Sequence, residues 1–225
     1  FYDRRDEETG YVARIRRLLK QYGNNAVIPV WDTERGIAWK SPATNRVDHY
    51  YTLDPERDNT EFSDVLDVAR RLPAIHAAAF ASGVEKVFWF YLDSSTQTIA
   101  KTAERYGFFD AQLEPMPHLA VYDALTETLG AATFERLYER PDGVRGYIFK
   151  KESDTVILAF NWKETVSTLS IRDHGAEMDI LDVMGNPVAG GMSRLPSSDA
   201  ATIALDGWPR YLVVKDRKPR QIVLQ

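Results

Sequence analysis

Cysteine is absent from the 225 residues of this sequence. Its absence excludes disulfides, thiolate metal sites and a cysteine nucleophile together. The four histidines are scattered, and no helical histidine pair supplies the ligand cluster of a zinc enzyme. A Gly-x-Ser-x-Gly motif, which would indicate a serine hydrolase, is also missing. The sequence therefore predicts neither a metal site nor a cofactor.

Strong charge and long apolar runs are missing as well. The formal net charge is −5, which gives no electrostatic argument for binding nucleic acid or an anionic membrane. No apolar run approaches the roughly 20 residues of a membrane-spanning helix. We therefore expect neither nucleic acid nor a membrane as a partner. The composition fits a soluble protein, cytoplasmic or exported, and leaves the compartment open.

Residues 25–36, NAVIPVWDTERG, are the stretch from which a function can be argued. Residues 26–31 are apolar, and polar residues and Gly36 follow, which is the pattern of a fully buried strand. In sheets of buried parallel strands, the chemistry lies at the carboxyl ends of the strands. Glu34 stands at that end, between Trp31 and Trp39. A carboxylate beside indole rings suits attack on a sugar, because the rings pack against the sugar while the charge reacts.

Helical and strand-like segments alternate over the first 130 residues. We predict helices at residues 6–21, 60–82 and 120–129, and buried strands at residues 26–31 and 86–93. Pro73 should kink or split the second helix. This alternation, with short helix-to-strand connections, indicates right-handed βα units. The aromatic loop at residues 37–59 contains His49, and Asp93 ends the second strand, so both are candidate sugar contacts. The alternative for Asp93 is that it caps the next turn.

The periodicity changes after residue 140. Residues 141–143 form a Pro-Asp-Gly turn, and short segments with period-two alternation follow. We predict these strands at residues 144–150, 155–162, 166–171, 178–183, 202–205 and 211–214. Such a series favours a small antiparallel β-sandwich. We therefore expect two domains, residues 1–139 of α/β type and residues 140–225 of all-β type.

The segment VWDTERG resembles strand seven of the clan A glycoside hydrolases, the retaining (β/α)8-barrel enzymes, and the whole chain is similar to family 39 and family 5 members in its order of parts. This resemblance implies that residues 1–139 are the last part of such a barrel, with β7, β8 and their flanking helices, and that a trailing β-sandwich domain follows. It also implies that Glu34 is the catalytic nucleophile. The alternative is a Glu34 that pairs with Arg35 or caps a helix.

The resemblance implies two more roles near Glu34. Trp89 matches the tryptophan that floors the sugar subsite, and Tyr2 loosely matches a tyrosine that hydrogen-bonds the nucleophile. We expect Glu34 and Trp89 to lie on the same side of their strands. The alternatives are a Trp89 in the core, an ordinary terminal Tyr2 and a solvated His49. The candidate substrate-binding residues are Trp89, Trp39, Tyr2, Trp31, Asp93 and His49.

A retaining enzyme also needs an acid/base carboxylate, and the resemblance places it before Phe1. The expected partners are therefore a carbohydrate substrate and the missing N-terminal part of the barrel, and we expect the 225-residue chain alone to be inactive. The alternative function is a non-catalytic carbohydrate-binding or structural fragment. The sequence leaves the sugar, the linkage and exo or endo action open.

Overall fold

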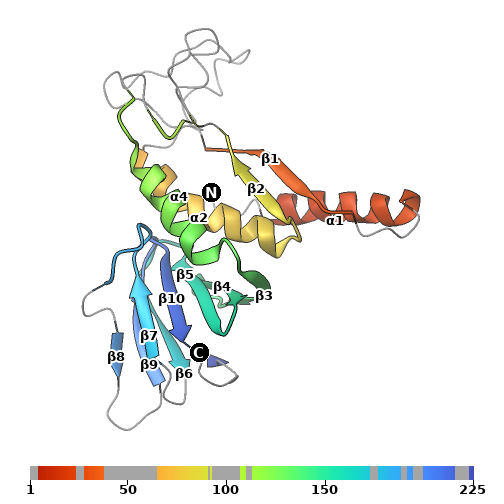
Figure 1. Cartoon of the computed structure of the whole chain (residues 1–225). Helices are drawn as coiled ribbons and strands as arrows, with labels where there is room; N and C mark the ends of the chain where they lie inside the picture. Colours follow the sequence, from red (N-terminus) through yellow and green to blue (C-terminus); the bar gives the residue numbers. More distant parts are fainter. Residues whose placement is uncertain are drawn as a thin grey trace. The chain divides into compact units, whose positions relative to one another are not determined.

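The computed structural model describes residues 5–23, 28–37, 65–90, 92, 107–109, 113–172, 177–188, 192–194, 200–215 and 223–225. The chain divides into two compact units. One is Arg5–Tyr122, and the other consists mainly of Asp123–Gln225. Figure 1 shows the helices and strands of both.

The helices begin and end where the sequence provides the appropriate residues. α1 (Arg5–Tyr22) is followed by Gly23, whose amide donates to the carbonyl of Leu19 at 2.7 Å. α2 (Val65–Ala81) ends shortly before Gly83, which has a φ of +89° that favours glycine. α4 (Pro117–Leu129) begins with proline, which suits the first turn of a helix.

α2 continues through Pro73 as one helix, so the predicted split is wrong, whereas the alternative, a kink at Pro73, stays a prediction. Proline removes one backbone hydrogen bond, at a cost of about 3 kcal/mol. The buried side of α2 surrounds this position, since Leu72 and Ala74 are both buried. Tertiary packing of this apolar side therefore holds the helix together across the proline.

β1 (Trp31–Arg35) and β2 (Lys86–Trp89) form a parallel two-stranded sheet, coloured orange and yellow in Figure 1. The strand predicted at residues 26–31 begins only at Trp31, and residues 28–30 lie outside it. The predicted full burial is also wrong, because Trp31 is 51% exposed and Phe88 45% exposed. Within the described residues, helices cover one face of this sheet and leave the other open.

The helix-covered face of the sheet is held by two apolar clusters. Val87 of β2 packs against the cluster that contains Val12 of α1 and Ala79 of α2. Trp89 packs against the cluster that contains Val68 of α2 and Met116. These contacts fix β2, and through it β1, on the helices.

The second unit consists mostly of two antiparallel sheets. The five-stranded sheet has the order β3 (Thr133–Glu139), β4 (Val144–Lys151), β5 (Asp154–Asn161), β10 (Arg210–Lys215), β7 (Glu177–Leu181). The four-stranded sheet has the order β11 (Val223–Leu224), β6 (Ser167–Arg172), β9 (Ala200–Leu205), β8 (Met192–Arg194). The six predicted strands and their antiparallel pairing are confirmed, whereas β3, β8 and β11 were not predicted.

Both sheets contribute to one buried core. Ile148 and Leu212 come from the five-stranded sheet, Leu169 and Ile203 come from the four-stranded sheet, and all four belong to the same cluster. The two-residue period of the sequence produces this core, because alternate side chains of a strand point to the same face.

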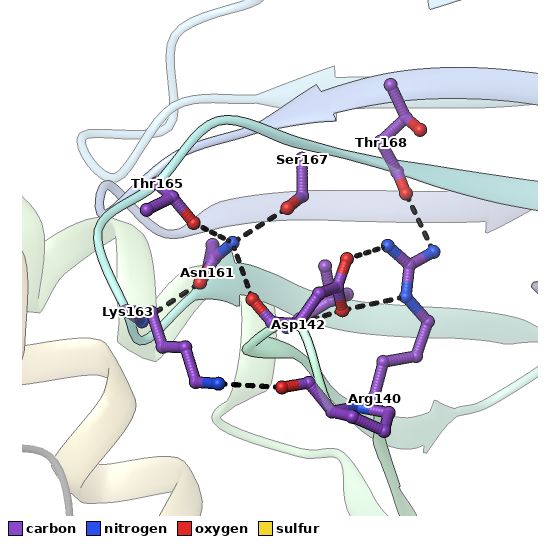
Figure 2. A network of polar contacts seen from close by, with 9 residues as sticks. Arg140, Asp142, Asn161, Lys163, Thr165, Ser167 and Thr168 are labelled. Atoms are coloured by element: carbon purple, nitrogen blue, oxygen red, sulfur yellow. Dashed lines mark hydrogen bonds and ion pairs between the residues drawn. The ribbon is translucent and has the colours of Figure 1, made fainter.

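Asn161 ties together the turns at one end of these sheets, as Figure 2 shows. Its buried Nδ2 lies within hydrogen-bonding distance of the Asp142 carbonyl at 3.3 Å, Thr165 Oγ1 at 3.1 Å and Ser167 Oγ at 2.9 Å. Its Oδ1 accepts the Lys163 amide at 2.9 Å. The turn before β4 is thereby connected to the turn between β5 and β6.

Arg140 strengthens the same connection (Figure 2). Its guanidinium donates to the Asp142 carboxylate, at 3.0 Å from Nε, and to the Thr168 carbonyl at 2.8 Å. The Arg140 contact lowers the pKa of Asp142 to about 2. The domain boundary predicted between residues 139 and 140 stays a prediction, and β3 pairs with β4 across it.

Candidate active site at the ends of two parallel strands

Glu34 and Trp89 lie at the carboxyl ends of neighbouring strands. Glu34 is the second-last residue of β1 and is exposed, and Trp89 is the last residue of β2. Because the strands are parallel, these two ends meet at the same edge of the sheet. The chemistry predicted from the sequence belongs to this edge.

A β-bulge interrupts β1 at Glu34. The register shifts between Asp32 and Arg35, so that Thr33 and Glu34 together stand opposite the single residue Phe88. Bulges are frequent beside active sites, where the extra residue changes the direction of a side chain. The regular pairing of β1 is therefore broken at the predicted nucleophile.

The open face of the strand pair is defined by Trp31, Lys86 and Phe88. The ring centroids of Trp31 and Phe88 are 6.2 Å apart, and Lys86 Nζ lies 4.6 Å from the Trp31 centroid. Trp31 is the first residue of β1, roughly 10 Å along the strand from Glu34 at about 3.3 Å per residue. The predicted sugar contact Trp31 thus lies nearer the amino end of its strand than the edge that carries Glu34.

An ion pair spans the bulge. Arg35 Nε donates to Asp32 Oδ2 at 2.7 Å, and a second guanidinium nitrogen contacts the same oxygen. The two side chains are largely buried, with Arg35 19% exposed and Asp32 23% exposed. Asp32 stands opposite Val87 and Arg35 stands opposite Trp89, and both of these β2 residues pack against the helices, so the pair lies on the helix-covered face of the sheet.

Trp89 lies inside an aromatic cluster formed by His76, Trp89, Phe108, His118 and Tyr122. Its indole stacks on His76 at 5.9 Å and on Phe108 at 5.7 Å, and His118 lies tilted at 5.9 Å. Tyr122 lies 5.0 Å from Phe108 and 5.8 Å from His76. These surroundings are those of a core residue, as the alternative for Trp89 held, and its role as a sugar platform stays a prediction.

The two histidines of the aromatic cluster are buried and neutral at pH 7. His76 Nδ1 bonds the Leu72 carbonyl at 2.8 Å, and His118 Nε2 bonds the Gly107 carbonyl at 2.7 Å. Because a carbonyl accepts, these nitrogens carry the protons. The other ring nitrogens are buried and have no hydrogen-bond partner among the residues that the structure describes. Burial lowers the pKa of both imidazoles to about 4.

Four predicted site residues lie outside the described residues: Tyr2, Trp39, His49 and Asp93. Their predicted contacts with a sugar stay predictions.

Two features of the site were not predicted from the sequence. His118 stands alone at the start of a helix, where no periodic pattern marks it. The ion pair of Asp32 and Arg35 was missed because residues i and i+3 of a regular strand point to opposite faces. Only the bulge brings these two side chains to the same side.

Neither metal ligation nor membrane spanning is indicated by the described residues. They contain no group of three or more His, Cys, Asp or Glu side chains arranged to hold a metal ion. None of the helices among them is long and apolar enough to cross a membrane.

Known protein families and curated proteins gave no match to this chain. Solved structures did. A family 39 glycoside hydrolase from the gut symbiont Bacteroides cellulosilyticus WH2 matches with a TM-score of 0.65 and 15% identity, over 91% of this chain and 38% of that one. A family 30 subfamily 8 xylanase, Xyn30A, from Clostridium acetobutylicum matches with a TM-score of 0.56 and 10% identity, over 83% and 42%.

A family 30 endoxylanase from Clostridium papyrosolvens C71 matches with a TM-score of 0.52 and 9% identity, over 89% of this chain and 44% of that one. The chain thus spans about two fifths of the length of these enzymes. At such low identity the likeness concerns the fold. The resemblance to clan A suggested by VWDTERG is confirmed at this level: the chain has a fold similar to part of the family 39 and family 30 glycoside hydrolases.

Proposed function

We propose that this chain is the C-terminal part of a retaining glycoside hydrolase that cleaves O-glycosidic bonds with Glu34 as nucleophile. Residues 1–139 are the last portion of a (β/α)8 barrel, and residues 140–225 are its β-sandwich domain. One observation carries the proposal: in a fold similar to glycoside hydrolases, an exposed glutamate occupies a bulge at the carboxyl end of a parallel strand. The substrate is a carbohydrate.

The mechanism is a double displacement. Retaining enzymes hold two carboxyl groups about 5–5.5 Å apart. The Glu34 carboxylate attacks the anomeric carbon and forms a glycosyl ester as the bond to the leaving oxygen breaks, and the second carboxyl group protonates that oxygen. The second group then takes a proton from water, whose oxygen attacks the anomeric carbon as the bond from that carbon to the Glu34 oxygen breaks, which frees the Glu34 carboxylate. We place this acid/base in a barrel segment upstream of Phe1.

The same upstream segment would cover the open face. Trp31 and Phe88 expose large apolar rings there, and an apolar patch of this kind favours a partner surface. The proposed sugar contacts are Trp39, Tyr2, His49, Asp93 and Trp89, whereas the ring of Trp31 would be covered by the upstream segment.

Substitution of Glu34 tests the proposal. The assay protein is this chain joined to the barrel segment that we propose precedes Phe1, and it is named the extended protein. Glu34→Ala and Glu34→Gln should each lower turnover of aryl glycosides by several orders of magnitude, because the covalent intermediate is proposed to form on the Glu34 carboxylate. Azide, a small external nucleophile, should restore part of the turnover of Glu34→Ala. Glu127→Ala, at an exposed position of α4, is the control. Near-normal turnover without Glu34 would refute the proposed mechanism.

The second candidate is a non-catalytic carbohydrate-binding or structural fragment. The packing of Trp89 in the aromatic cluster favours it, because an indole that stacks on His76 and on Phe108 serves packing first. An extended protein that binds glycans and hydrolyses none of them would support this candidate instead.

A further inference from the structure

We propose that Asp32 and Arg35 are positioning residues that hold the bulge of β1 and so determine the face on which Glu34 presents its carboxylate. This inference rests on the proposed function of Glu34.

Backbone contacts fix β1 on both sides of the bulge. Before it, the Glu85 amide donates to the Val30 carbonyl at 2.9 Å. After it, the Phe90 amide donates to the Arg35 carbonyl at 2.7 Å, and Arg35 stands opposite Trp89. The extra residue therefore lies between two segments that are held by backbone hydrogen bonds. The conformation of Thr33 and Glu34 then depends on the side-chain contact across the bulge.

The ion pair can form only while the bulge is present. Without the extra residue, side chains alternate strictly along the strand, and residues 32 and 35 point to opposite faces. In that arrangement Glu34 falls on the same face as Asp32, which is the helix-covered face. A shift of one residue exchanges the two faces of a strand. The contact between Arg35 Nε and Asp32 Oδ2 thus selects the conformation in which Glu34 stands with Phe88 instead.

The surroundings make the pair effective. Both side chains are largely buried, and Arg35 stands opposite Trp89, which stacks on His76. Burial keeps His76 neutral, so its imidazole cannot replace either charge. Charge-assisted hydrogen bonds of arginine to carboxylate are strong and directional. Loss of either residue removes the contact that spans the bulge, so the bulge should lose its preferred geometry.

The test compares Asp32→Asn, Arg35→Gln and the double variant in the extended protein. A glutamate aimed about 1 Å away from its place should lose roughly 10- to 100-fold in kcat. We expect this loss in both single variants with KM within twofold, and no further loss in the double variant. Labelling with a 2-deoxy-2-fluoro glycoside, followed by mass spectrometry, counts the competent sites, so kcat is expressed per site.

A matched ion pair serves as the control. Asp67 and Arg70 of α2 have the same residue types, the same spacing and similar burial, at 26% and 16% exposed. Asp67→Asn and Arg70→Gln should leave kcat per site within twofold. The charge-exchanged variant, Asp32→Arg with Arg35→Asp, should recover at least part of the lost kcat.

The outcomes separate this inference from the proposed function. If Glu34→Ala abolishes turnover while the Asp32 and Arg35 variants keep kcat per site, positioning is refuted and the nucleophile stands. If the variants lower the number of labelled sites with unchanged kcat per site, the pair serves folding alone and positioning is again refuted. If Glu34→Ala retains turnover, the proposed function fails, and positioning of a nucleophile fails with it.

Discussion

At the scale of single residues, the neutral histidines of the aromatic cluster predict sensitivity to acid. The pKa of His76 and of His118 falls from an ordinary value of 6.5 to about 4 because both are buried. The unfolded chain therefore binds more protons than the folded chain below pH 6.5. The free energy of unfolding therefore carries no penalty from these histidines above pH 6.5. It decreases as the pH falls toward 4, by about 3 kcal/mol for each histidine.

Urea unfolding of the chain at pH 7.0, 5.5 and 4.5 measures this loss. His76→Phe keeps an aromatic ring and removes the titration, so its unfolding free energy should fall less between pH 7.0 and 4.5. An equal fall in the original chain and in His76→Phe would contradict this prediction, because it would show that His76 takes up no extra proton on unfolding.

Gly143 is a second residue whose replacement has a predictable result. Its φ is +100°, and a Cβ there would lie 2.8 Å from Lys163 Cγ and closer still to Asn161 Oδ1. Gly143→Ala should therefore cost roughly 3 kcal/mol, because it adds backbone strain and disturbs the Asn161 contacts. The control is Gly146→Ala, where the nearest atoms stand at 3.4 Å. Urea midpoints that shift equally in both variants would contradict the strain argument.

At the scale of elements, Trp89 connects β2 to α2 through the aromatic cluster. Trp89→Ala should destabilise this region by about 3–5 kcal/mol, since it removes a large packed side chain. Phe88→Ala, on the open face, should cost far less because Phe88 is 45% exposed. Hydrogen exchange of the α2 amides, residues 65–81, reports the difference. Equal protection in the two variants would mean that Trp89 does not hold β2 on α2.

The sequence predicts well those elements whose apolar residues recur with a clear helical or strand period. The helices and the six alternating strands lie within a few residues of their predicted bounds. The predicted bounds of β1 were too early in the sequence, because the apolar run at residues 26–31 precedes the residues that pair with β2. β3 was missed because Glu135, Arg136 and Glu139 mask its alternation with charge, whereas pairing with β4 makes it a strand.

At the scale of the whole molecule, the open face predicts the behaviour of the chain by itself. We expect no hydrolysis of aryl glycosides, because the proposed acid/base lies upstream. We also expect self-association, since exposed strand edges and the rings of Trp31 and Phe88 invite pairing with other chains. Light scattering after size exclusion measures the association, and a panel of aryl glycosides measures the activity.

A surface variant separates the open face from general stickiness. Trp31→Ser with Phe88→Ser should reduce the association, whereas Trp208→Ser, which removes an exposed ring from the second unit, should not. Turnover by the chain alone that is lost in Glu34→Gln would place both carboxylates within these 225 residues and refute the truncated barrel.

The sequence by itself determined the local order of this protein: which segments are helical, which alternate as strands, and that Glu34 follows an apolar run beside tryptophans. These features depend on neighbours in the chain, whose periods of 3.6 and 2 residues are visible in any sequence. Tertiary structure alone decided the bulge that sets Glu34 opposite Phe88, the contact of Asp32 with Arg35, and the enclosure of Trp89 by His76 and His118. Each of these features depends on strand register or on burial. Register and burial are set only when segments distant in the sequence pack together.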